Sequence, residues 1–190
     1  MSTSTAQQTT EFSNPNLETL YTGDRIQARV RELGAQITSD YAGKTLYVVG
    51  VLKGSCVFMA DLIRHIDLPM EIDFMAVSSY KDELRSTGDV EILKDLMKPI
   101  RDRHVIIVED IVDTGLTLSH LLELLGTRGA ASLRLATLLD KPEPRIKKEL
   151  VIDYTGFQIP NKFVVGYGLD AAGRYRNLPF IAVVKDPSAV

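Results

Sequence analysis

The chain has 190 residues, of which 45% are hydrophobic, and its 22 basic and 25 acidic side chains give a formal net charge of −3. A chain of this length buries enough apolar surface to fold without disulfides or a structural metal. The single cysteine, Cys56, excludes an internal disulfide, and the acidic balance argues against a broad nucleic-acid-binding surface.

Residues 1–15 are polar and rich in Ser and Thr, which predicts a disordered tail, and we expect a single domain over residues 16–190. No stretch reaches the ~18 apolar residues of a membrane span, and residues 1–20 lack the basic residues and apolar core of a secretory signal. We therefore expect a cytoplasmic protein with no membrane partner.

Helix and strand patterns alternate along the chain. Ile26, Val30, Leu33 and Ile37 share one face of a helix that starts at Asp24 and ends near Gly43. In chain order there follow a strand at 46–51, a helical pattern over 57–66, a strand at 72–77, a charged loop or hairpin arm at 81–89, a strand at 105–108, a helical pattern over 118–125, a strand at 133–139, a connection at 141–148, and strands at 163–165 and 180–184. This alternation predicts an α/β fold with a twisted, mainly parallel sheet flanked by helices.

Ligands of such sheets bind beyond the carboxyl ends of the strands. The strand at 105–108 leads directly into Glu109, Asp110 and Asp113, and the turn 113–117 then opens a helix. Free N–H groups at a helix start favour an anion, Gly115 allows close backbone approach, and the hydroxyls of Thr114 and Thr117 donate hydrogen bonds. The turn therefore predicts a phosphate cradle, with the preceding acids facing sugar hydroxyls or a metal. The alternative is that Thr114 only caps the helix and the acids are solvated charges.

The string IIVEDIVDTGLTL at 106–118 resembles the signature of type I phosphoribosyltransferases, which bind 5-phosphoribosyl 1-pyrophosphate. Further segments make the chain similar to hypoxanthine-guanine phosphoribosyltransferases over about residues 15–185: VLKGSCVFMADL at 51–62, SSY at 78–80, STGD at 86–89, LLDKPEPR at 138–145 and IPNKFVVGYGLD at 159–170. The resemblance implies that terminal segments form a small hood over the carboxyl edge of the sheet. It also implies a purine-salvage enzyme that makes inosinate or guanylate and releases pyrophosphate.

The resemblance assigns roles to single residues. Asp113 would be the catalytic acid or base near N7 of the purine, and the ribose and 5′-phosphate would be bound by Glu109, Asp110, Asp113, Thr114, Gly115, Leu116 and Thr117. Pyrophosphate would contact Lys53, Gly54 and Arg176, and the bond between Leu52 and Lys53 would be a non-proline cis peptide. The purine would be bound by Ile111, Lys141, Phe163, Val164 and Asp170, with Phe163 stacking on the base and Lys141 donating to its 6-oxo group.

The family's magnesium would be held by Glu109, Asp110 and Asp170, and Ser79 and Tyr80 would begin a mobile lid. Family members commonly form homodimers or homotetramers. The sequence departs from the family's pattern at two places. The lid lacks a glycine after Tyr80, and Leu116 stands where some animal enzymes have lysine. Cys56, on an apolar helical face, is interpreted as a small core residue rather than a nucleophile.

Three other functions remain open. A regulator with this fold would bind RNA through a basic face, for which Arg101, Arg103, Arg145 and Lys147 leave some room despite the net charge of −3. A phosphoribosyltransferase for another base, such as xanthine or a pyrimidine, is the nearer alternative, because Lys141 and Phe163 favour 6-oxopurines without ranking hypoxanthine, guanine and xanthine. A response-regulator-like acidic pocket would leave the cradle unused.

Overall fold

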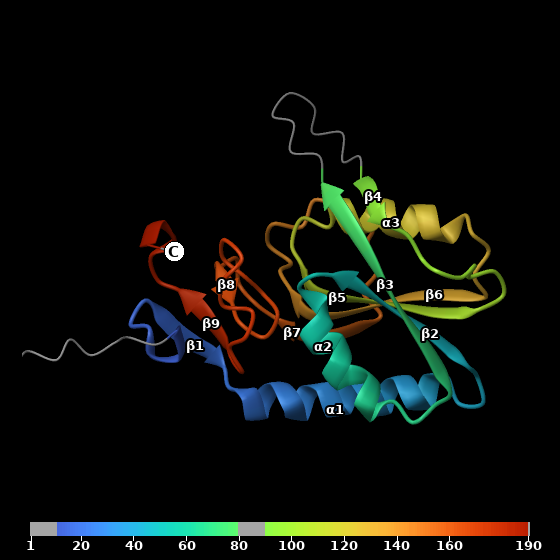
Figure 1. Ribbon diagram of the computed structural model, residues 1–190, viewed down its shortest axis with the longest axis horizontal. Helices are drawn as coiled ribbons and strands as arrows, with labels where there is room; N and C mark the ends of the chain where they lie inside the picture. Colours follow the sequence, from blue (N-terminus) through green and yellow to red (C-terminus); the bar gives the residue numbers. More distant parts are fainter. Residues whose placement is uncertain (1–10, 80–89, 190) are drawn as a thin grey trace, which may run out of the picture.

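The main body of the protein is a six-stranded sheet. The computed structural model describes residues 11–79 and 90–189, and Figure 1 shows their arrangement. In spatial order the strands are β4 (Val90–Lys94), β3 (Met70–Ser79), β2 (Leu46–Leu52), β5 (His104–Val112), β6 (Ser132–Asp140) and β7 (Tyr154–Gln158). All neighbouring pairs run parallel except β3 and β4, which pair antiparallel. The carboxyl ends of five strands therefore meet along one edge.

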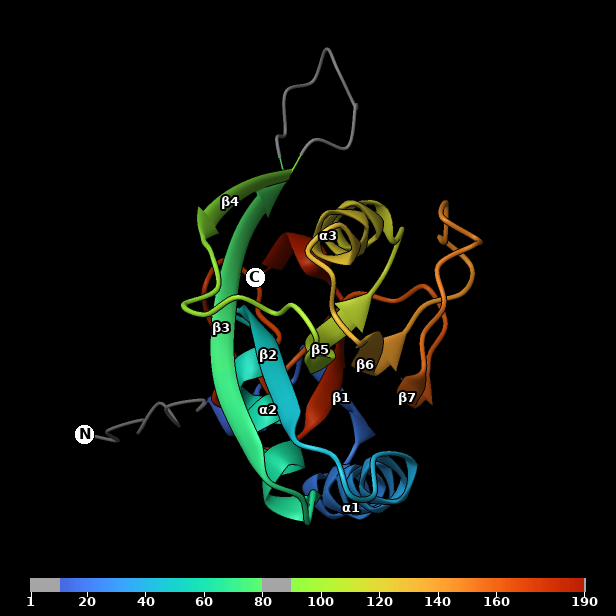
Figure 2. The same ribbon diagram turned by 90° about the vertical axis from the view of Figure 1, so that its right-hand side faces the viewer.

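Helices cover both faces of this sheet. Figure 2 shows α3 (Leu116–Gly126) on one face and α1 (Gly23–Asp40) and α2 (Ser55–Leu62) on the other. Because side chains alternate along a strand, Val48 belongs to the core cluster beneath α1 and α2, whereas its neighbour Val49 belongs to the cluster beneath α3. Burial on both faces explains why the central strands are continuous apolar runs.

A second, three-stranded antiparallel sheet lies beyond the carboxyl ends of the main strands (Figure 1). It joins β1 (Leu17–Tyr21), β9 (Ile181–Val184) and β8 (Val164–Val165), so both terminal parts of the chain contribute to it. Val164 and Ile181 also belong to the core beneath α1 and α2. This sheet corresponds to the hood that the resemblance implied, and it holds 163–165 and 180–184 away from the main sheet.

Most of the predicted elements are confirmed. The four apolar residues predicted on the first helix, Ile26, Val30, Leu33 and Ile37, are fully buried. The second helix is shorter than predicted, because α2 ends at Leu62, a 3-10 turn follows at Ile63–His65, and Ile66 is extended. Sequence patterns missed β1, β4 and β7, which are five-residue strands at the edges of their sheets.

Two further expectations concern short segments. Within the predicted tail, residues 1–10 lie outside the described part of the chain, whereas Glu11–Ser13 form a 3-10 turn and the Asn14 amide lies 3.3 Å from the Tyr175 hydroxyl. The interpretation of Cys56 as a core residue is wrong: it is exposed, because it lies on the outer side of the first turn of α2. None of the described helices has the length and apolar character that crossing a membrane requires.

Candidate functional site

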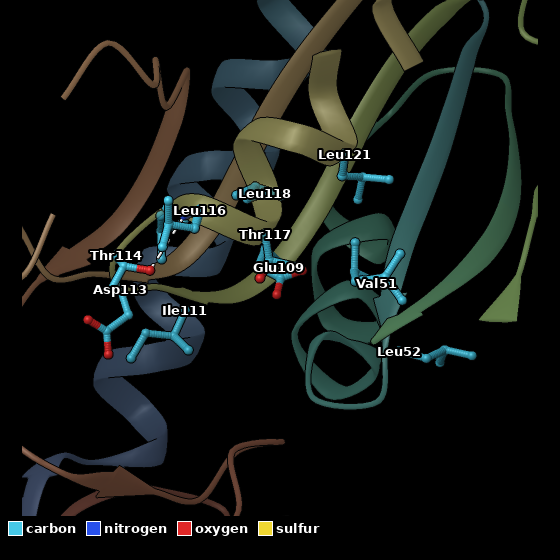
Figure 3. A pocket seen from close by; sticks show the side chains of 13 residues that line it. Val51, Leu52, Glu109, Ile111, Asp113, Thr114, Leu116, Thr117, Leu118 and Leu121 are labelled. Atoms are coloured by element: carbon cyan, nitrogen blue, oxygen red, sulfur yellow. Dashed lines mark hydrogen bonds between the residues drawn. The ribbon is translucent and has the colours of Figure 1, made fainter. Parts of the chain in front are cut away.

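A cavity of about 270 Å³ lies at the carboxyl ends of β2, β3 and β5. Its wall includes the whole turn from Asp113 to Thr117, together with Glu109 and Ile111 of β5. Figure 3 shows Asp113 and Thr114 at one side of this cavity and Val51 and Leu52 of β2 at the other. The cavity therefore joins the predicted cradle to the strand that leads into the predicted pyrophosphate loop.

The turn between β5 and α3 has the geometry of an anion cradle. Gly115 has a φ of +77°, a left-handed conformation that glycine adopts without steric cost, and it is the N-cap of α3. It caps the helix without a side chain, and the Thr114 hydroxyl approaches Leu116 N only at 3.5 Å. The alternative that Thr114 is the N-cap is therefore wrong. The first residues of α3, Leu116 to Leu118, line the cavity, where the helix dipole favours negative charge.

Two adjacent carboxylates, Glu109 and Asp110, lie beside this cradle. The Oε2 atom of Glu109 is fully buried and has no hydrogen-bond partner among the residues that the structure describes. Burial, with a smaller contribution from Asp110, raises the pKa of Glu109 well above its ordinary value. Burial also raises the pKa of Asp110 to about 6, although the N–H of Ile111 and the charge of Arg176 partly offset it. Buried, incompletely satisfied carboxylates of this kind mark a candidate binding site.

The predicted pyrophosphate residues meet the acidic strand end. The peptide bond between Leu52 and Lys53 is cis, as the resemblance implied. Gly54 follows it and packs directly against the Asp110 carboxylate, with Arg176 close by. Arg176 is ion-paired with Asp170 at 2.6 Å and donates to the Gly168 carbonyl. The structure therefore brings Gly54, Asp110, Asp170 and Arg176 together, although Lys53 itself is exposed and does not line the cavity.

Of the predicted purine residues, Lys141 lies at the Asp113 end of the site. The side chain of Lys141 is only 8% exposed, and its Nζ lies 3.5 Å from Oδ2 of Asp113. Lys141 is therefore buried, although it begins the charged connection predicted at 141–148. Ile111 and Val164 both pack on the core beneath α1 and α2. Phe163 is 43% exposed, so it is not a core aromatic and its ring is free to meet a ligand.

Some predicted residues are not joined to the cavity by the structure. Lys141, Phe163, Val164 and Asp170 are not part of its wall. Ser79 ends β3, and Tyr80 and the charged segment 81–89 lie outside the described residues. Among the described residues no three His, Cys, Asp or Glu side chains form a group that could hold a metal ion, so Glu109, Asp110 and Asp170 are not a preformed three-ligand site.

The sequence patterns did not identify Arg145 as a part of this site. Its guanidinium is almost buried and donates to the carbonyl of Asp113 at 2.8 Å and to that of Val112 at 3.1 Å. The segment LLDKPEPR drew attention to this region, but the arginine was considered only as part of a basic face. Its hydrogen-bond partners on the turn are backbone carbonyls, which leave no trace in the sequence.

Comparison with known proteins gives consistent results. The family model for the phosphoribosyl transferase domain matches residues 16–172. The chain is 53% identical to a hypoxanthine-guanine phosphoribosyltransferase of Streptococcus pneumoniae, over 92% of this chain and 97% of that one. It is 52% identical to one of Bacillus subtilis, over 87% and 92% respectively. A crystal structure of a hypoxanthine phosphoribosyltransferase from Staphylococcus aureus superimposes with a TM-score of 0.86 at 50% identity, covering 90% of this chain and 92% of that one.

Proposed function

The chain belongs to the hypoxanthine-guanine phosphoribosyltransferase family, and we propose that it transfers the phosphoribosyl group of 5-phosphoribosyl 1-pyrophosphate to N9 of hypoxanthine or guanine. One observation carries the assignment of the site. The buried Lys141 ammonium lies 3.5 Å from the Asp113 carboxylate, directly at the end of a phosphate cradle. A donor for the base and a cradle for the sugar phosphate are thus adjacent, as a transfer between the two requires.

The donor substrate fits the acidic end of the cavity. The 5′-phosphate would lie in the turn 113–117, where backbone N–H groups and the start of α3 face the cavity. Glu109 and Asp110 would accept hydrogen bonds from the ribose hydroxyls, which would satisfy the buried Oε2 atom of Glu109. The pyrophosphate would then lie toward Gly54 and Arg176, with Lys53 at the rim.

Magnesium fits this set of donors. Mg²⁺ prefers oxygen ligands and is usually bound by one or two carboxylates together with substrate phosphates, so a preformed three-carboxylate site is not needed. Glu109, with its unsatisfied buried oxygen, and its neighbour Asp110 would hold one ion, and Asp170 would contribute near the pyrophosphate. When bound, magnesium would neutralise charge on the departing pyrophosphate.

The base would bind between Lys141 and the hood. Lys141 would donate to the 6-oxo group, Phe163 would stack on the ring and Val164 would offer backbone groups to its edge. A buried ammonium accepts nothing, so a 6-amino group opposite it would leave two donors facing each other, and adenine would be rejected. In the reaction N9 forms a bond to C1′ of the ribose as the bond from C1′ to pyrophosphate breaks, and Asp113 accepts the proton from N7.

The RNA-binding alternative finds less support. Three of the four cations that it requires are engaged within the protein: Arg103 with Glu71 at 2.9 Å, Arg145 with Asp140, and Lys147 with Glu149 at 3.7 Å. Arg103 also stacks over the ring of Tyr47. A surface whose cations are already paired gains little from phosphate contacts.

The decisive experiment is an assay with magnesium, 5-phosphoribosyl 1-pyrophosphate and each of hypoxanthine, guanine, xanthine and adenine, followed by absorbance. We expect inosinate and guanylate to form and adenylate not to form. The yields with hypoxanthine, guanine and xanthine, compared with one another, rank the three 6-oxopurines as substrates. Absence of product with every base, together with salt-dependent RNA binding, would favour the regulator instead.

The remaining expectations belong to the same proposal. Residues 16–190 would form one domain, which is supported by the core cluster that joins Ile26 of α1 to Val164 and Ile181 of the hood. Ser79 and Tyr80 would begin a lid that excludes water from the ribosyl centre. The family resemblance supports a homodimer or homotetramer, which light scattering on the purified protein would test, and the cytoplasmic location stays a prediction.

A further inference from the structure

Two consecutive carbonyl groups behind the phosphate cradle are held by a single arginine. Arg145 Nε donates to the carbonyl of Asp113 at 2.8 Å, and Arg145 Nη2 donates to that of Val112 at 3.1 Å. The Val112 carbonyl accepts a second hydrogen bond from Lys141 N at 2.9 Å. The backbone on either side of the Asp113 side chain is therefore fixed by the segment 141–145.

The next carbonyl is held in the same way. Thr114 O accepts hydrogen bonds from Ile146 N at 3.0 Å and from Lys147 N at 3.1 Å. Arg145 also packs against the cradle through its aliphatic part, because its Cδ lies 3.1 Å from the position that a Cβ on Gly115 would occupy. All three carbonyls from Val112 to Thr114 thus face the segment 141–147.

This orientation determines where the amide groups of the cradle point. In a trans peptide the C=O and the following N–H point in opposite directions. The N–H groups of Asp113, Thr114 and Gly115 therefore point away from the segment 141–147, toward the cavity that these residues line. Within the described part of the chain none of these three N–H groups makes a hydrogen bond. They are three preoriented donors for an anion.

Arg145 is itself fixed from its far side. It forms an ion pair with Asp140 in which the two side chains are only 10% and 9% exposed, and Gln158 Nε2 lies 3.3 Å from the other oxygen of Asp140. A planar guanidinium can serve a carboxylate and two carbonyls at once through its rigid fork, whereas a lysine ammonium on a flexible stem cannot reproduce this geometry. The arrangement therefore requires arginine and not merely a positive charge.

We propose that Arg145 is a positioning residue that turns the amide N–H groups of residues 113–115 into a ready-made site for the 5′-phosphate. The inference rests on the proposed function, because it assumes that a sugar phosphate occupies the cradle. Arg145 does not touch the phosphate in this role. It acts by holding the carbonyls on the opposite side, so that binding does not have to reorganise the turn.

The test compares Arg145→Lys with Arg134→Lys, a second ion-paired arginine that contacts Asp40 and Asp153 away from the cradle. The probes are ribose 5-phosphate, which requires the cradle, and magnesium pyrophosphate, which does not. We expect Arg145→Lys to weaken ribose 5-phosphate binding about tenfold, the value of one charge-assisted hydrogen bond. Binding of pyrophosphate should stay within about twofold of wild type, as should both ligands in Arg134→Lys.

Kinetics add a second readout. In Arg145→Lys the KM for 5-phosphoribosyl 1-pyrophosphate should rise more than the KM for hypoxanthine, and Arg145→Gln, which has no charge, should show the same split. Equal weakening of both probes, or of neither, would overturn the positioning role. If the wild type binds ribose 5-phosphate and pyrophosphate but forms no nucleotide, the proposed function fails, whereas the binding comparison still decides the role of Arg145.

Discussion

The carboxylate of Asp110 occupies the space beside Gly54 that any larger residue would need. A β-carbon built on Gly54 would lie 1.5 Å from Oδ2 of Asp110 and 2.6 Å from its Cγ. The loop that starts at the cis peptide bond therefore packs on the acidic end of β5 without any intervening side chain. This contact is what brings the proposed pyrophosphate and ribose subsites together.

Gly54→Ala should displace the Asp110 carboxylate and leave the fold intact. Gly54 has an ordinary helical conformation with a φ of −62°, so alanine strains no backbone dihedral, but its methyl group must push Asp110 away. A displacement of about 1 Å in a catalytic site costs on the order of 10²-fold in activity. The measurements are kcat/KM and the thermal unfolding midpoint.

The control for this change is Gly126→Ala. Gly126 is the last residue of α3, and a β-carbon there would meet nothing within 4 Å. Activity should be unchanged, and stability should stay equal or rise by up to about 1 kcal/mol because alanine favours a helix. Full activity in Gly54→Ala would show that the position of Asp110 is not critical.

The sequence was sufficient to predict the central strands, which are buried on both sides, and the helices that pack on them. The strand at 105–108 is a continuous apolar run, and Ile26, Val30, Leu33 and Ile37 recur at helical spacing, because burial requires apolar residues at these positions. The strands β1, β4 and β7 were missed because edge strands have one partner and half-exposed sides, which weakens the pattern.

The parts of the site that depend on particular side chains were predicted from the sequence, whereas the parts that depend on backbone contacts or on the fold were not. The acids at the end of β5 were found because the site requires their carboxylates. The turn 113–117 was found because it requires a glycine, which adopts a left-handed conformation at Gly115. The backbone hydrogen bonds of Arg145 impose no residue pattern on their acceptors, so no sequence signal marks them. Neither pattern nor composition reveals that Lys141 is buried, since its burial depends on the fold.

Asp113→Asn should lower kcat far more than it weakens substrate binding. The carboxylate manages the N7 proton, and removing a general acid or base typically costs 10²- to 10⁴-fold, roughly, whereas the backbone of the cradle stays in place. The matched control is Asp95→Asn, because Asp95 and Asp113 are both 48% exposed and both ion-paired. Single-turnover rates provide the measurement, and an unchanged chemical step would remove Asp113 from this role.

Lys141→Met should reduce discrimination between purines. Methionine keeps most of the length of the buried side chain but donates nothing to a 6-oxo group. Loss of a charge-assisted hydrogen bond should lower kcat/KM for hypoxanthine roughly 10- to 100-fold. The ratio of kcat/KM for hypoxanthine to that for adenine should fall with it. Lys148→Met, an exposed change in the same connection, should leave the ratio unchanged, and an unchanged ratio in Lys141→Met would exclude Lys141 as the selecting group.

The stability of the protein in acid should depend on Asp73 of β3, whose carboxylate accepts hydrogen bonds from Tyr47 and Met97. Burial alone would raise its pKa, but hydrogen bonds from the Tyr47 hydroxyl and the N–H groups of Met97 and Phe74 outweigh it and lower the pKa to about 2. The unfolded chain protonates this group near 3.8, so its contribution is complete above that pH and is lost as the pH falls toward about 2. The difference in unfolding free energy between wild type and Asp73→Asn should shrink over this window.

Tyr47, which donates a hydrogen bond to Asp73, should make stability depend on pH in the alkaline range as well. Burial, the hydrogen bond to Asp73 and its charge raise the pKa of Tyr47 to about 12 from 10.0, so its contribution is complete below pH 10 and is lost as the pH rises toward 12. Tyr47→Phe should cost about 1.5–3 kcal/mol at neutral pH, because it removes a 2.7 Å hydrogen bond to a buried carboxylate. Its deficit should decrease between pH 10 and 12 in urea unfolding. Tyr21→Phe, which removes a hydroxyl from a ring that stacks on Phe157, is the control for the substitution itself, and a constant deficit for Tyr47→Phe between pH 10 and 12 would contradict the coupling.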